Sequence, residues 1–289
     1  MENQRTKDKD ALSKKTHVKT VHIDTSLQIE RCKASPKADV VERSLEPYRF
    51  KSTSTYAKLE FKRAWLQRLA YIYSICYEVT RVDELLGYVD DKLGAHPKLA
   101  RKLTTCIQTI VAYLSKIQGR LTPEAQLLRF RSHVRKGIMG AYAWWDWSVT
   151  HQYHGTECKR ATEEPKMRPN GKIDVSIPRC LRDKTHCGVQ IFFEENKQAF
   201  AKLKSAIEES GQIMSDEIKA WKEVIEKAER DPLVLLDSKI CSMLSDAIIA
   251  VDGIDIDCFA ANNDKEWIFL SEVFGKELLN PVRNAKEVR

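Results

Sequence analysis

The sequence predicts an α/β fold with a central parallel sheet and a mostly helical insertion. Residues 21–23 form a short β-branched segment before Asp24, and residues 254–260 form a second short apolar segment before Asp264. Long amphipathic stretches separate the two. Acids that follow parallel strands meet at the carboxyl edge of the sheet. We therefore expect the two ends of the chain to build one sheet and one site.

Length and composition are those of a globular protein that buries a full core. The chain has 289 residues, of which 43% are hydrophobic, and a formal net charge of +7. It has no run of about 18 apolar residues of the kind that spans a membrane, and its first residues lack a signal-peptide core. We expect a cytoplasmic protein with free thiols, no membrane partner and a polyanionic ligand.

The composition also suggests where the chain divides. We expect a flexible tail over residues 1–17, a sheet domain split between residues 18–80 and 231–289, and a basic helical insertion over residues 81–230. The tail is polar and lacks periodicity, which is typical of mobile termini.

The elements before the insertion are a strand and a helix. Residues 20–23 predict a strand, and a loop around Pro36 interrupts the chain. Apolar residues recur at helical spacing between about residues 54 and 78, with Ser52 or Ser54 as the N-cap. Glu60 falls in the second turn of this helix.

The insertion is read as a series of helices. Pro97 and Pro123 suit the first turns of two of them. Residues 98–136 contain nine Lys or Arg residues against one acid, Glu124, a net charge of +8. Residues 190–193 predict either a short strand or the start of a helix. A long helix then follows over residues 194–230, broken near Gly211 and ended at Pro232.

Four acids form the candidate site: Asp24, Glu60, Asp246 and Asp264. Clustered carboxylates raise one another's pKa unless a divalent cation lies between them, so the cluster implies Mg²⁺ or Mn²⁺. Such ions activate water and stabilise the charge that develops in phosphodiester cleavage. The alternatives are a helix cap for Asp246 and, for Glu60, an ion pair with a cation on its own helix, namely Lys58, Lys62 or Arg63.

With these motifs in order, the chain resembles the PIN-domain nucleases, including those that act as toxins in bacterial toxin–antitoxin pairs. The matching segments are, in chain order, residues 23–26 (IDTS), 55–60 (TYAKLE), 246–250 (DAIIA), 262–267 (NNDKEW) and 278–281 (LLNP). The last acid of the family pattern corresponds to Asp264 or, alternatively, to Glu266. The Thr that is usual before it is replaced by Ala261 or Asn262, and the large insertion is absent from the family pattern.

The resemblance implies a PIN-like three-layer sandwich and a metal-dependent endoribonuclease, a toxin or defence effector among the candidates. It also implies that Thr25, Ser26 and Asn263 orient ligands or phosphate, with RNA favoured over DNA as substrate. An inhibitory or assembly protein and a second copy of the chain are candidate partners. The alternatives are a noncatalytic nucleic-acid-binding or assembly module with the same fold, and a nuclease that acts on DNA or on particular structures.

A second candidate metal site lies in the insertion. Six residues that can ligate zinc fall within a short stretch, namely His151, His154, Cys158, Cys180, His186 and Cys187. Four of them suffice for a structural Zn²⁺ that holds a loop. Paired Cys-x-x-Cys knuckles are absent, so unrelated thiols and surface histidines are the alternative interpretation.

The insertion also offers a nucleic-acid surface. Its candidate phosphate contacts are Arg129, Arg131, Arg135 and Lys136. Close to them in sequence, Trp144, Trp145 and Trp147 are candidates for stacking on unpaired bases, with helix packing as the alternative. Three tryptophans within four residues cannot all face one core, so we expect at least one to be exposed.

Overall fold

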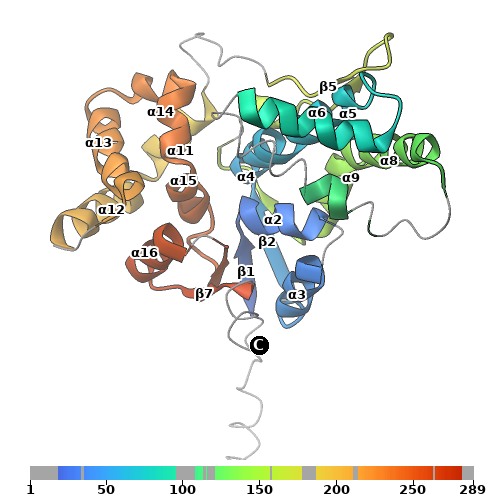
Figure 1. Cartoon of the computed structure of the whole chain (residues 1–289). Helices are drawn as coiled ribbons and strands as arrows, with labels where there is room; N and C mark the ends of the chain where they lie inside the picture. Colours follow the sequence, from blue (N-terminus) through green and yellow to red (C-terminus); the bar gives the residue numbers. More distant parts are fainter. Residues whose placement is uncertain are drawn as a thin grey trace, which may run out of the picture.

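The computed structural model (Figure 1) describes most of the chain. The described residues are 19–33, 36–95, 108–112, 115, 121–156, 158–177, 187–210, 214–262 and 264–281. The predicted tail, residues 1–17, lies outside them. So do Cys180, His186 and Asn263, and the side chain of Asp264.

A five-stranded parallel sheet forms the centre of the fold, which confirms the predicted α/β class. The strand order is β3-β2-β1-β6-β7. The strands are β1 (Thr20–Ile23), β2 (Phe50–Ser54), β3 (His151–Tyr153), β6 (Cys258–Ala260) and β7 (Glu277–Leu279). Strands from the two ends of the chain are neighbours, because Val21 of β1 pairs with Cys258 of β6.

The two faces of the sheet bury different hydrophobic clusters, since successive side chains of a strand point to opposite faces. On one face, Val21 and Ile23 pack with residues of α2 (Thr25–Cys32) and α3 (Pro36–Leu45). On the other, Phe259 packs with residues of α15 (Ser245–Asp252) and α16 (Asp264–Phe274). The arrangement therefore has three layers, helices, sheet and helices (Figure 1).

One nearly continuous helical run leads from the sheet into the predicted insertion. It consists of α4 (Thr55–Phe61), a π-helical turn (Lys62–Leu66) and α5 (Gln67–Ile75). Ser54 caps it by accepting a hydrogen bond of 2.9 Å from the backbone of Ala57, which confirms one of the two predicted caps. Ser52 lies inside β2 instead, and its hydroxyl is 2.9 Å from Nδ1 of the buried His22. Strand β2 was not predicted from the sequence.

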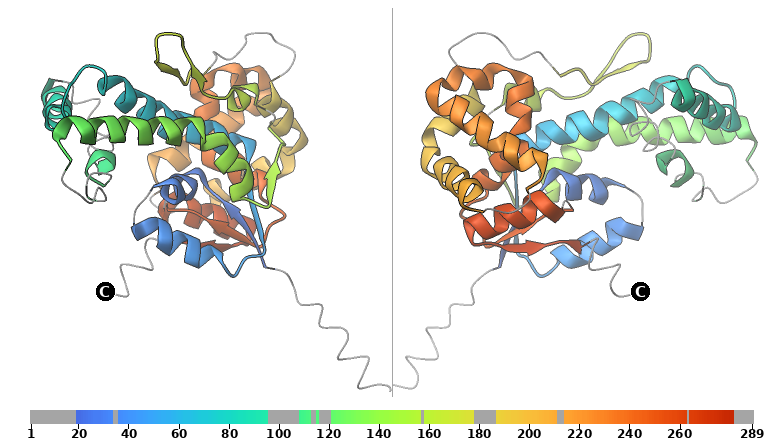
Figure 2. Two further views of the ribbon diagram at one scale, coloured as in Figure 1. Left: turned by 90° about the vertical axis from the view of Figure 1, so that its right-hand side faces the viewer. Right: turned by 60° about the vertical axis from the view of Figure 1, so that its left-hand side comes forward.

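Three helices pack together and extend away from the sheet: α5, α6 (Val82–Ala95) and α8 (Pro123–Met139), as Figure 2 shows. Pro123 occupies the first turn of α8, as predicted. Helix α9 (Ala141–Ser148) follows and returns the chain to the sheet. In α9, Trp145 is fully buried, while Trp147 is 73% exposed. The expectation that the three tryptophans do not share one core is confirmed.

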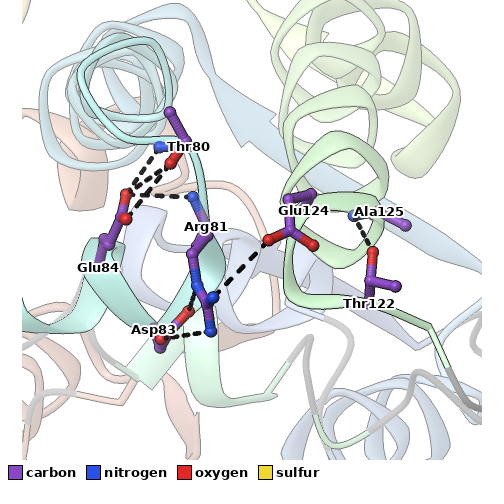
Figure 3. A network of polar contacts seen from close by, with 7 residues as sticks. All are labelled: Thr80, Arg81, Asp83, Glu84, Thr122, Glu124 and Ala125. Carbon is purple, nitrogen blue, oxygen red and sulfur yellow. Dashed lines mark hydrogen bonds and ion pairs between the residues drawn. The ribbon is translucent and has the colours of Figure 1, made fainter.

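A polar network joins the starts of α6 and α8 (Figure 3). The carboxylate of Glu84 accepts hydrogen bonds of 2.8 Å from the backbone of Thr80 and 3.2 Å from that of Arg81. Arg81 also pairs with Asp83 at 3.0 Å and reaches Glu124 on α8 at 3.8 Å. All these groups are open to water, so the network fixes orientation more than it adds stability.

The rest of the insertion contains further helices and a small hairpin. The elements are α10 (Lys159–Thr162), β4 (Lys166–Met167), β5 (Ile173–Asp174), α11 (Gly188–Glu195), α12 (Lys197–Glu209), α13 (Asp216–Arg230), a 3₁₀ turn (Pro232–Leu236) and α14 (Ser238–Met243). Residues 190–193 are thus helical and not a strand. The long helix predicted over residues 194–230 is divided, with α12 ending before Gly211 and α13 beginning after it.

The predicted insertion is not independent of the sheet. Its strand β3 pairs with β2, Ser52 opposite His151, and forms one edge of the central sheet. One hydrophobic cluster also includes residues of α4, of α8 and of α15. Among the described residues, no helix combines the length and the apolar character needed to cross a membrane.

Candidate metal centre

Asp24 stands where β1 ends and α2 begins. Its backbone N–H donates to the carbonyl of Ala260, so the backbone pairing between β1 and β6 continues up to this residue. Its Oδ2 accepts hydrogen bonds from the backbone (2.9 Å) and the hydroxyl (2.5 Å) of Ser26. Oδ1 is buried and has no hydrogen-bond partner. One carboxylate oxygen is thus held in place, while the other is left for a ligand.

The topology places Asp24 where a parallel α/β sheet usually binds ligands. From β1 the chain proceeds to β2 and then β3 on one side, whereas β6 and β7 lie on the other side. The helices that follow β1 and β6 therefore lie on opposite faces of the sheet, and in open α/β sheets this switch point, at the carboxyl ends of the strands, is where ligands usually bind. Ser26 links the two strand ends, because its hydroxyl accepts a hydrogen bond of 3.1 Å from the backbone of Asn262.

Glu60 and Asp246 approach Asp24 from two other helices, α4 and α15. Glu60 lies near the end of α4, and its Oε2 accepts a hydrogen bond of 3.0 Å from the hydroxyl of Thr25. Asp246 lies in the first turn of α15. One oxygen of each of the three carboxylates lies within 4.8 Å of those of the other two. The sequence motifs from both chain ends therefore meet, as predicted.

The three carboxyl groups are in an environment that disfavours their charge. Burial raises the pKa of Asp24, although its hydrogen bonds to Ser26 act in the opposite direction. Burial, followed by the charge of Asp24, raises the pKa of Glu60 to about 7. The pKa of Asp246 is raised by burial and then by Asp24 and Glu60. A divalent cation would remove this penalty by neutralising the group.

The alternative interpretation as a helix cap applies to Asp24, which is the N-cap of α2, and not to Asp246, because the N-cap position of α15 is Leu244. Two helix neighbours of Glu60 make contacts elsewhere: Lys58 pairs with Asp146 at 2.7 Å, and Lys62 donates to the carbonyl of Glu163 at 2.6 Å. The charge of the third neighbour, Arg63, acts to lower the pKa of Glu60. In the part of the chain that the structure describes, no Lys or Arg forms an ion pair with any of the three acids.

The residues around the candidate fourth ligand are only partly described. Asp264 begins α16 just beyond β6, as the motif requires, and its side chain lies outside the described set, as does Asn263. The alternative, Glu266, is buried and accepts a hydrogen bond of 2.8 Å from the hydroxyl of Ser215, the N-cap of α13. The charge of Glu266 also contributes to raising the pKa of Asp246, so Glu266 stays a candidate for the fourth ligand.

The hydroxyls of Thr25 and Ser26 contact the candidate metal ligands themselves. Thr25 and Ser26 were expected to orient ligands or phosphate, and their hydroxyls bind the carboxylates of Glu60 and Asp24. Ser245, which the sequence analysis did not single out, also hydrogen-bonds to Glu60. Its signal in the sequence was its place directly before Asp246.

The described members of the candidate zinc group do not form a metal site by themselves. His154 lies 3.2 Å from the hydroxyl of Thr55, and His151 is exposed in β3. Cys158 and Cys187 are the N-cap residues of α10 and α11. Among the described residues, the only His, Cys, Asp or Glu group with metal-ligand spacing is that of Asp24, Glu60 and Asp246. With Cys180 and His186 outside the described residues, the zinc site stays a prediction.

The comparisons with known proteins add no assignment. No family model, no curated protein and no solved structure matches this chain.

Proposed function

We propose that the protein is a metal-dependent endoribonuclease of the PIN-like class. The observation that carries the proposal is the convergence of Asp24, Glu60 and Asp246, with ligand oxygens within 4.8 Å of one another, at the switch point of a parallel sheet. The resemblance of the sequence motifs around these acids to the PIN-domain nucleases also supports it.

The donor set suits Mg²⁺ or Mn²⁺. These hard cations prefer carboxylate oxygens and retain several waters. Asp24 is buried, whereas Glu60 and Asp246 are half-buried, so the group combines a desolvated ligand with access from solvent. The orphaned Oδ1 of Asp24 is a buried acceptor that an ion would satisfy. Asp264 is the proposed fourth ligand.

The roles of the side chains follow from their contacts. A divalent ion at this site supplies Lewis acidity toward water and the phosphodiester group. Asp24, Glu60 and Asp246 would hold that ion. Thr25 and Ser26 fix one oxygen each of Glu60 and Asp24, and Ser245 also hydrogen-bonds to Glu60. The unpartnered Oδ1 of Asp24 would be available to the ion. No side chain is needed as a nucleophile.

One observation favours the noncatalytic alternative, a nucleic-acid-binding or assembly module. At the end of β6, where the family pattern has a hydroxyl, this chain has Ala261 or Asn262. Ala261 is fully buried, and its backbone donates to the carbonyl of Leu279. The hydroxyl of the family pattern is therefore absent at the end of β6. A cleavage assay separates the nuclease from the noncatalytic module.

The deciding experiment is a cleavage assay on end-labelled RNA and DNA of the same sequence, with and without Mn²⁺. We expect RNA cleavage that requires the ion and is nearly abolished in Asp24→Asn and Asp246→Asn. The matched control is Asp252→Asn, a change of the same chemistry at the other end of α15, which should retain activity. Wild-type rates in the first two variants would refute the metal centre. Cleavage of DNA but not of RNA would refute RNA as the substrate. If the wild-type protein cleaved neither RNA nor DNA, with or without Mn²⁺, the noncatalytic module would be favoured.

The same assay identifies the fourth ligand. We expect Asp264→Asn to lose more activity than Glu266→Gln, because Asp264 is closer to the end of β6 and Glu266 is bound to Ser215. The opposite order would assign the fourth position to Glu266.

A further inference from the structure

Tyr77 forms the centre of an exposed basic surface far from the three carboxylates. It lies just beyond the end of α5 and is 43% exposed. Its hydroxyl is 2.8 Å from that of Tyr73, which fixes the ring. The guanidinium of Arg131 on α8 lies over the ring, 4.5 Å from its centroid. Stacking on a tyrosine orients Arg131 and leaves its N–H groups available for other partners.

The four cations of α8 that the sequence analysis grouped together fall on two different sides of the helix. Arg131 and Arg135 are four residues apart and share one side, beside Tyr73 and Tyr77. Arg129 and Lys136 are seven residues apart and share another side, roughly 130° around the helix. Arg129 and Lys136 are both exposed. Only the first pair adjoins Tyr77.

The β4–β5 hairpin extends this surface. Its turn contains Gly171 with φ +78°, and a Cβ at this position would lie 3.6 Å from the hydroxyl oxygen of Tyr77. The turn therefore rests on Tyr77. It is flanked by Arg168, which pairs with Asp174 at 2.6 Å, and by the exposed Lys172. The hairpin is attached to α5 at its base, because Gln67 Nε2 donates to the carbonyl of Val175 at 3.3 Å.

The surface, here called the Tyr77 patch, comprises Tyr77, Arg131, Arg135, Arg168 and Lys172. Within the described part of the chain, Arg131, Arg135 and Lys172 form no ion pair, unlike Arg31, Lys58 and Lys204, which all do. Three elements distant in sequence thus present uncompensated cations around one aromatic ring. Guanidinium groups in such a setting match phosphate, which they bind through paired N–H groups.

We propose that the Tyr77 patch binds the phosphates of a single RNA strand at a distance from the point of cleavage and so anchors long substrates. The inference rests on the proposed function, because the bound strand is its substrate. Along the helical run, Glu60 and Tyr77 lie about 25 Å apart, at 1.5 Å per residue. At 3.4 Å per stacked nucleotide, that distance corresponds to about seven nucleotides. A stacked strand therefore needs about this length to occupy both places.

The test measures binding of a fluorescent RNA of about 20 nucleotides by anisotropy over a salt series. All proteins carry Asp24→Asn and are kept in chelator, so no strand is cut. Arg131→Gln/Arg135→Gln is compared with Arg129→Gln/Lys136→Gln, which removes the same charge from the same helix. We expect the first pair to weaken binding about tenfold and to reduce its salt slope by about 1.4. The second pair should change both far less.

Equal effects of the two double variants, or no effect of the first, would overturn the anchoring role. Because loss of Arg131 also removes its contact with Tyr77, Lys172→Gln serves as a second variant on an exposed position, and it must weaken RNA binding as well. The outcome is separate from that of the cleavage assay. Cleavage without this binding pattern refutes the patch alone, and the binding pattern without cleavage by the wild-type protein refutes the proposed nuclease alone.

Discussion

The hydroxyl of Thr25 lies 3.0 Å from Oε2 of Glu60. Thr25, which directly follows Asp24, therefore also orients Glu60 on α4. Hydrogen-bond partners behind a metal ligand fix its orientation, and their loss typically lowers metal affinity about 10- to 100-fold. We expect Thr25→Val, which keeps the shape and removes the hydroxyl, to weaken Mn²⁺ binding within that range. Calorimetric titration measures it.

Thr25→Ser is the control for this change, because it retains the donor. It should bind Mn²⁺ within a few-fold of the wild-type affinity. If Thr25→Val bound the ion as tightly as the wild type, Glu60 would not depend on this hydrogen bond.

We expect Asp252 to make the stability of the protein depend on pH, independently of the metal centre. Burial raises its pKa from 3.8 to about 7, and its Oδ2 has no partner. The folded protein thus binds a proton at pH values where the unfolded chain has lost it, so stability falls as the pH rises from about 4 to above 7. The resulting loss of free energy of unfolding between these pH values is at most about 4 kcal/mol.

Asp252→Asn should remove this component and make the protein more stable than the wild type at pH 8, with little change at pH 4. Urea unfolding at the two pH values measures it. If Asp252→Asn and the wild type showed the same dependence of unfolding free energy on pH, ionisation of Asp252 would not destabilise the folded protein.

Gly253 is required by its contact with His22. A Cβ at Gly253 would lie 2.4 Å from Cγ of the buried His22 ring, closer than atoms can approach. Gly253 also ends α15, the helix that carries Asp246. Overpacking of this kind costs typically about 1–3 kcal/mol, and we expect Gly253→Ala to lower the free energy of unfolding by about that amount.

Gly87→Ala provides the comparison, because no atom lies within 4 Å of the added Cβ and the residue is inside α6. Replacing a helical glycine by alanine should stabilise by about 0.5–1 kcal/mol. Equal effects of the two substitutions in denaturant titrations would exclude the His22 contact as the cause.

The candidate zinc site can be tested through the zinc content of the purified protein. If Cys158, Cys180 and Cys187 bind zinc together with His151, His154 or His186, protein purified without chelator carries about one zinc per chain. Cys180→Ser should then lose the metal and destabilise the insertion, with Mn²⁺ binding at Asp24 unchanged. Elemental analysis that finds no zinc would leave these residues as ordinary thiols and imidazoles.

Local sequence predicted the elements that carry the acids. The β-branched residues before Asp24, the Ser54 cap and the apolar helix after Asp246 are encoded within a few residues, and each is present in the structure. It did not reveal β2 or β3. Residues 50–54 (FKSTS) and 151–153 (HQY) are too polar to resemble strands. Their polar side chains are accommodated by contacts with distant residues, such as that of Ser52 with His22.

The sequence by itself thus determined the α/β class and the acids from both chain ends that share one site. The tertiary structure decided what these residues contact. Only the packing of α4 against α2 shows that Thr25 holds Glu60, and only the placement of the β4–β5 hairpin brings Gly171 next to Tyr77. The physical reason is range: caps and periodicity act within a few residues, whereas these contacts join residues separated by tens of positions, whose spacing only the folded backbone fixes.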